Sequence, residues 1–177
     1  MDISALQSWQ NFYVIIGSAG GALIGIQFVV ITLISTMRTR PDVESVNAFG
    51  SPTVVHFTTA LVVAALMCSP WSSLRPLSVA LAIWGISGFI YSLVVFRRAG
   101  HQKSYKPDLE DWIYYVISPS VLYAILSFAS LIECLAPRVG LYTLAAALLG
   151  LLLVGIRNAW DSVTHLAIAA NQSNTPE

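Results

Sequence analysis

The chain has 177 residues, of which 56% are apolar and only 10% are charged. A soluble domain carries about 25% charged residues, so this composition indicates a chain embedded in lipid. Nine basic and nine acidic residues cancel, which leaves no basic field to attract nucleic acid. The apolar segments have the length of membrane helices and lack the alternating pattern of β-barrel strands. We therefore predict an all-α fold, a polytopic transmembrane helical bundle.

Five apolar segments predict five membrane spans within a single transmembrane domain over residues 1–177. The first span has no basic segment before it and no signal-peptide cleavage site after it, so we expect it to be retained. The second span is the shortest and ends before Pro70. After the fifth span the helical pattern continues as a short extension before a polar tail. The expected spans cover residues 12–36, 53–69, 77–96, 112–135 and 139–160.

Basic residues in the loops predict the orientation, because they concentrate on the cytoplasmic side of a membrane. Only Arg75 and Arg138 lie in the second and fourth loops. We therefore expect the N-terminus outside and the C-terminus in the cytoplasm, in a bacterial inner membrane. A re-entrant second segment would instead invert the spans that follow it. Seven basic residues lie on the other side: Arg38, Arg40, Arg97, Arg98, Lys103, Lys106 and Arg157.

The first span contains a row of small residues in the segment GSAGGALIGIQFVVITLIST. Gly17, Gly21 and Gly25 are spaced by four residues, and Thr32 continues the row along one helical face. Small residues let two helices approach closely in lipid. We expect this face to pack against another helix, either of the same chain or of a second copy. The GxxxGxxxG pattern resembles the glycine zippers of several oligomeric channel proteins, and that resemblance implies self-association.

Two polar residues within the first two expected spans are candidates for a function. Gln27 is close to the middle of the first span and faces away from the glycine row. An amide at that depth needs a partner, so it either bonds to another helix or faces a pore or a solute. His56 lies in the first turn of the second span. It is either a proton-sensitive group or a side chain that reaches the lipid headgroups.

A polar cluster lies at the cytoplasmic end of the fifth span and comprises Arg157, Asn158, Asp161 and His165. Arg157, Asp161 and His165 are spaced by four, share one helical face, and allow an ion pair between the first two. Trp160 faces elsewhere and suits the membrane interface. The cluster is either a charged helix end or a cytoplasmic gate or docking surface.

The start of the fourth span has its own polar features. Asp108, Glu110 and Asp111 precede it, and we favour a role in capping the helix, where negative charge is stabilising. The same acids are alternatively neighbours of the cluster after the fifth span. Pro119 lies inside this span and permits a kink, because neighbouring groups can satisfy the carbonyl that proline leaves free.

The two cysteines are expected at equal depth. Cys68 ends the second span and Cys134 ends the fourth. A disulfide between them is compatible with the oxidising outer side. Two free thiols are the alternative that we favour.

Catalytic motifs are missing from the sequence. It contains no HExxH, CxxC, P-loop or GxSxG pattern and no metal-ligand spacing, so we predict no enzyme, no metal and no cofactor. Few charges lie within the spans, which argues against an ion-coupled transporter. We predict an oligomeric channel, or a conduit for a small solute or ion, assembled through the glycine face of the first helix. The alternative is a non-transporting subunit or regulator that binds another membrane protein through that face. The lipid bilayer and a second copy of the chain are the expected partners, and nucleic acid is not.

Overall fold

The computed structural model describes residues 4–36, 43–101 and 109–172, and at several helix ends it describes the backbone alone. All regular structure in these ranges is helical, so the predicted all-α fold is confirmed. Three elements are short: α1 (Ser4–Gln7), α5 (Leu109–Asp111) and the π-helix η1 (Trp112–Ile117). Five are long: α2 (Gln10–Thr36), α3 (Val43–Cys68), α4 (Leu74–His101), α6 (Ser118–Leu135) and α7 (Pro137–Gln172).

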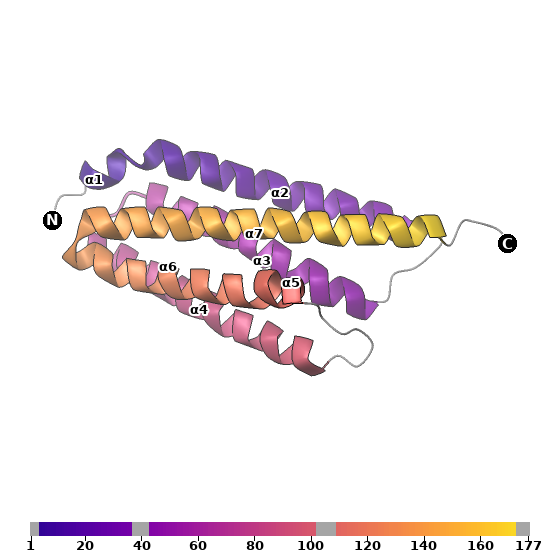
Figure 1. Ribbon diagram of the computed structural model, residues 1–177. Helices are drawn as coiled ribbons and strands as arrows, with labels where there is room; N and C mark the ends of the chain where they lie inside the picture. Colours follow the sequence, from indigo (N-terminus) through magenta and orange to yellow (C-terminus); the bar gives the residue numbers. More distant parts are fainter. Residues whose placement is uncertain (1–3, 37–42, 102–108, 173–177) are drawn as a thin grey trace.

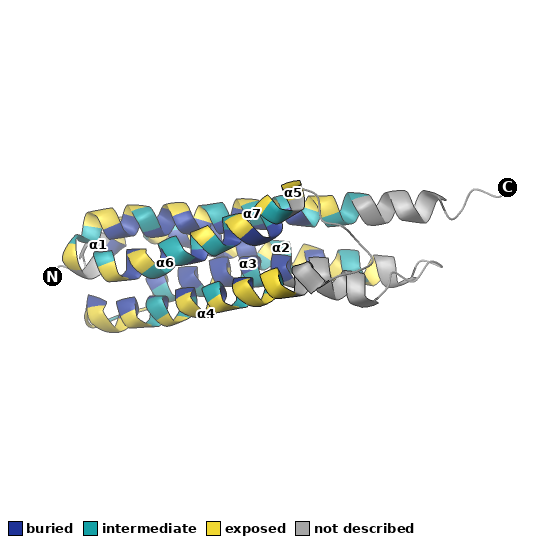
Figure 2. Ribbon diagram, turned by 60° about the horizontal axis from the view of Figure 1, so that its bottom comes forward, coloured by how far each residue is buried: buried dark blue, intermediate teal, exposed yellow. Residues whose placement is uncertain are grey.

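The long helices lie side by side in one elongated bundle (Figure 1). Helix α3 is central, because it contacts α2 on one side, α7 on another and α4 on a third. Helix α6 packs against both α4 and α7. The buried residues face the shared interior of these helices (Figure 2). Among them, Ala60 and Val63 of α3 have no exposed surface.

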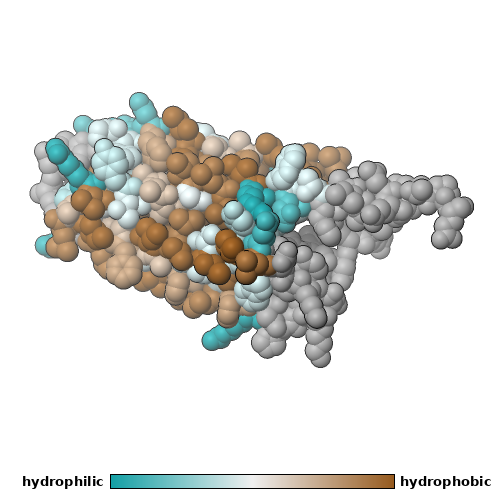
Figure 3. Space-filling model, in the orientation of Figure 1, coloured by the Kyte–Doolittle hydropathy of each residue, from teal (hydrophilic) through white to brown (hydrophobic). Residues whose placement is uncertain are grey.

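Four helices are long and apolar enough to cross a membrane, within the ranges that the structure describes. They make the chain a small multi-pass membrane protein. Many large apolar side chains on these helices are exposed, such as Phe28, Ile83 and Phe128. Figure 3 shows an apolar surface over the middle of the bundle, with hydrophilic residues toward its ends. This surface contacts the lipid bilayer. The four segments are Gln10–Leu33, Leu74–Arg97, Trp112–Ile132 and Pro137–Thr164.

Helix α3 differs from the other four. Its apolar part, Pro52–Cys68, is shorter than a typical span, although the helix itself begins at Val43 rather than near residue 53. Because other helices surround α3, its side chains meet protein more than lipid, and they need not be as apolar as those of a lipid-facing helix. The second predicted span therefore differs from the others in its length and in its central position.

Close contacts between helices occur at glycines. A Cβ atom added at Gly88 of α4 would overlap the ring of Tyr123 on α6. A Cβ atom added at Gly20 of α2 would lie 2.9 Å from the carbonyl oxygen of Phe57 on α3. In lipid, such approaches bring backbones together and supply much of the association between helices. The Gly88 contact also positions Tyr123 for the polar interactions described next.

Candidate functional site

A buried polar network joins three helices near the middle of the bundle. We call it the His56 network; its members are His56 and Thr59 on α3, Trp84 on α4 and Tyr123 on α6. The Tyr123 hydroxyl lies 3.0 Å from His56 Nδ1 and 3.1 Å from Thr59 Oγ1. Trp84 Nε1 donates to Thr59 Oγ1 at 3.3 Å. In an apolar interior each unmet polar group is costly, so these contacts fix how α3, α4 and α6 are rotated against one another.

One atom of the His56 network has no partner. The His56 side chain is 2% exposed, and its Nε2 atom makes no hydrogen bond with the described residues. A buried polar atom that stays unpaired costs roughly 1–3 kcal/mol. His56 therefore does not reach out to the lipid headgroups, which was one of its two predicted positions. It lies inside the protein.

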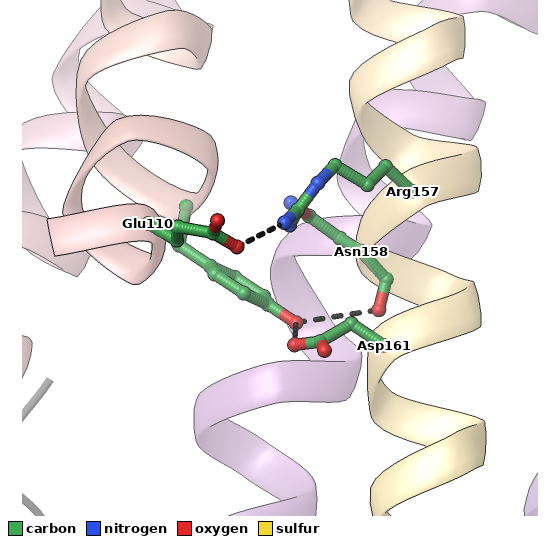
Figure 4. Close-up of polar contacts among 5 residues, drawn as sticks. Glu110, Arg157, Asn158 and Asp161 are labelled. Carbon is green, nitrogen blue, oxygen red and sulfur yellow. Dashed lines mark hydrogen bonds and ion pairs between the residues drawn. The ribbon is translucent and has the colours of Figure 1, made fainter. Parts of the chain in front are cut away.

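A second polar group surrounds Asn158 on α7, toward the end of the bundle where α7 continues to Gln172 (Figures 1 and 4). We call this end the C end. Asn158 is fully buried, and its Nδ2 atom donates to the backbone carbonyl of Tyr114 at 3.2 Å. The Tyr115 hydroxyl lies 3.3 Å from both the Asn158 carbonyl oxygen and Asp161 Oδ2, and these two acceptors share its one proton. These bonds attach α7 to the π-helix η1.

The π-helix explains why Asn158 is needed at this place. In a π-helix each carbonyl pairs with the N–H five residues later. The residue five positions after Tyr114 is Pro119, which has no N–H to donate to the Tyr114 carbonyl. The amide of Asn158 supplies the missing donor. The fourth predicted span thus consists of two pieces, η1 and α6, and Pro119 lies at the start of the second.

Arg157 pairs with a residue on another helix. Its Nη2 atom lies 2.9 Å from Glu110 Oε2, and its Cζ atom lies 3.6 Å from the centre of the Tyr114 ring. The spacing of four allows Arg157 to pair with Asp161 along α7, but Arg157 pairs with Glu110 and Asp161 accepts a hydrogen bond from Tyr115. Glu110 is thus a neighbour of the polar cluster on α7. From the sequence alone, this role is the alternative to helix capping, which we favour. Asp108 and the side chains of Asp111 and His165 lie outside the described residues.

The glycine row divides between the interior and the surface. A Cβ atom at Gly17 would lie 2.9 Å from Ala64 Cβ on α3, and one at Gly21 would lie 3.9 Å from Leu61. At Gly25 it would meet no atom within 4 Å. The start of the row therefore packs within the chain, and its end faces outward. The row rotates because a spacing of four is slightly longer than one helical turn.

Two further candidates of the first span differ in burial. Gln27 is 6% exposed, so its amide lies within the bundle. Thr32 is exposed and donates to the Phe28 carbonyl of its own helix at 2.8 Å. Cys68 is an exposed free thiol, and the side chain of Cys134 lies outside the described residues.

Several residues of the site carry no sequence signal strong enough to identify them. Thr59 follows His56 by three residues, so the pair shares a helical face, and this spacing is the only hint of a network. Tyr115, Tyr123 and Trp84 are aromatic residues in apolar helices, where a packing role is the ordinary expectation. Only the arrangement of helices reveals that their polar atoms meet.

The chain matches no protein-family model, no curated protein and no solved structure. Among the described residues, no group of three or more His, Cys, Asp or Glu side chains could hold a metal ion. A function for this protein must therefore be argued from its own geometry.

Proposed function

We propose that the protein is a membrane conduit for a small solute, with a path through the interior of the helical bundle. The observation that carries this proposal is the succession of buried polar groups toward the C end. The His56 network comes first, Asn158 and Tyr115 follow, and Asp161 ends the series at an exposed position. Polar residues inside a membrane bundle are costly, and they typically mark a solute or proton pathway.

The depths of the two polar groups support a continuous path. The ring of Phe57, next to His56, is the neighbour that a Cβ atom at Gly155 of α7 would meet. Asn158 lies three residues beyond Gly155, a rise of about 4.5 Å along the helix. The two groups are thus separated by about one helical turn in depth. A small molecule could exchange hydrogen bonds between them without crossing a long apolar stretch.

The position of Gln27 favours an interior path over a pore between subunits. A pore on a symmetry axis, lined by the first helix, would need this amide on the surface of the bundle. Gln27 is buried within the chain instead. It therefore adds a polar group to the interior, as His56 and Asn158 do.

Flux measurements on the purified protein in liposomes test the conduit. The panel comprises water, ammonia, protons and small monovalent ions, each compared with empty liposomes of the same lipid. We expect faster permeation of at least one small species. Rates equal to those of empty liposomes for the whole panel would rule out a conduit under these conditions and favour the second candidate function.

The second candidate is a subunit that binds another membrane helix through the outer face of α2. Helix α2 packs mainly against α3, and its opposite face exposes Gly25 with Ile26 and Val29 beside it. A leucine at Gly25 would fill that face without disturbing the bundle, because nothing lies near the added Cβ atom. Ala146, exposed on α7, is the matched control site.

The mass of the protein in mild detergent tests the second candidate for the case in which the partner helix belongs to a second copy of the chain. If α2 is the interface, wild type and Ala146→Leu form the same oligomer, and Gly25→Leu shifts toward the monomer. A monomeric wild type, or an oligomer that Gly25→Leu leaves intact, would exclude this face as a site of self-association.

A further inference from the structure

The donors and acceptors of the His56 network determine how its protons are placed. Thr59 has one hydroxyl proton, and it donates to the Val55 carbonyl at 2.9 Å. The contact between Thr59 and Tyr123 therefore needs the Tyr123 proton. His56 must then donate from Nδ1 to the Tyr123 oxygen. With a neutral imidazole protonated on Nδ1, every contact of the network is a hydrogen bond.

The same arrangement makes His56 Nε2 an acceptor. A neutral imidazole with a proton on Nδ1 keeps a lone pair on Nε2. Asn158 presents a second acceptor, because its Nδ2 atom donates to Tyr114 and its Oδ1 atom then points elsewhere. Neither His56 Nε2 nor Asn158 Oδ1 bonds to any described residue. Both buried atoms without a partner thus require a hydrogen-bond donor.

We propose that His56 Nε2 and Asn158 Oδ1 form an acceptor site for a small neutral hydrogen-bond donor, such as water or ammonia. Each side chain comes from a different helix, α3 and α7, which pack together at Phe57 and Gly155. A molecule with two or more N–H or O–H groups could bond to one acceptor and then to the other. This inference rests on the proposed conduit and names its class of solute.

The charge of the interior favours a neutral donor over a cation. The buried polar residues in the described part of the bundle are Gln, Thr, Ser, His and Asn, and none is an acid. A cation without a counter-charge is expensive in such an interior. A neutral donor needs only the two acceptors. The acids Asp161 and Glu110 are exposed, and Glu110 pairs with Arg157.

Nitrogen NMR on the full chain tests the acceptor site without a flux measurement. The protein carries three histidines, so selective ¹⁵N labelling gives few signals. The variant His56→Gln assigns the signal of His56 in lipid nanodiscs. We expect the proton on Nδ1 and an unprotonated Nε2. In Tyr123→Phe, where Nδ1 loses its acceptor, this tautomer should lose its preference, whereas Tyr142→Phe, at an exposed tyrosine outside the His56 network, should keep it.

Two arms of the experiment distinguish the donors. Methylamine is titrated against trimethylamine, whose neutral form has no N–H group, and contact of water with the ring is measured by magnetisation transfer. A shift of the Nε2 signal with methylamine alone supports an ammonia-like ligand, and transfer from water supports water. A proton on Nε2 in the wild type, or a ring that responds to neither donor, would overturn the site.

Failure of the site and failure of the conduit give different results. If the Nε2 signal responds to a donor but no flux occurs in liposomes, the acceptor site stands and the conduit falls. If flux occurs while His56 carries its proton on Nε2, the conduit stands and the acceptor site falls.

Discussion

The side-chain amide of Asn158 donates to the backbone carbonyl of Tyr114 at 3.2 Å. This bond supplies the donor that Pro119 cannot provide, and it attaches α7 to the π-helix η1. Because the amide is fully buried, water cannot replace it readily. The fold thus depends on a polar contact within the bundle, next to the groups that we assign to a solute path.

Replacing Asn158 with leucine should destabilise the bundle. The variant keeps the number and branching of the side-chain heavy atoms but leaves the Tyr114 carbonyl without its donor, at an expected cost of about 1–3 kcal/mol. Unfolding in detergent, followed by circular dichroism, measures the difference. Asn11→Leu is the matched control, because Asn11 is exposed on α2. Equal stability of the two variants would show that the Tyr114 carbonyl needs no donor from α7.

Two glycines should respond in opposite ways to alanine. Gly88→Ala places a methyl group against the Tyr123 ring, and overpacking of this kind costs about 1–3 kcal/mol. Gly25→Ala meets nothing within 4 Å, so its stability should equal or exceed that of the wild type. Thermal unfolding of both variants in the same detergent provides the comparison. A stable Gly88→Ala protein would contradict the close packing of α4 on α6.

The ion pair between Arg157 and Glu110 should contribute little to stability. Glu110 is 73% exposed, and an exposed pair typically contributes less than about 1 kcal/mol. We expect the free energy of unfolding of Glu110→Gln to lie within about 1 kcal/mol of the wild-type value. This free energy should also depend less on salt concentration. The stacking of Arg157 on Tyr114 remains in this variant. A loss as large as that of Asn158→Leu would mean that the pair is part of the buried structure.

The apolar helices and their approximate bounds could be predicted from the sequence, because length and hydrophobicity decide them. The four apolar helices lie near their expected spans, and α3 begins at Val43, earlier than its expected start at residue 53. Asn158 and His56 were candidates because polar groups at membrane depth are rare. Their partners were not predictable. The contact with Tyr114 depends on a local π-register, and the contact with Tyr123 depends on how closely α4 approaches α6 at Gly88.

Labelling of Cys68 tests the predicted orientation. Cys68 is an exposed thiol at the end of α3, on the side that we predict to be outside. In the Cys134→Ser variant, Cys68 is the single thiol. A membrane-impermeant maleimide should label it in intact spheroplasts to the same extent as in lysed ones. Labelling only after lysis would invert the orientation.

Flux through the interior is tested most directly by comparing wild type with His56→Leu in liposomes. The variant removes the unpaired acceptor and substitutes an apolar side chain, and its folding is checked by unfolding in detergent. An interior path predicts that the solute which the wild type passes fastest is passed at a several-fold lower rate by a folded His56→Leu protein. Equal rates in the two proteins, or no flux in the wild type, would contradict a path along His56.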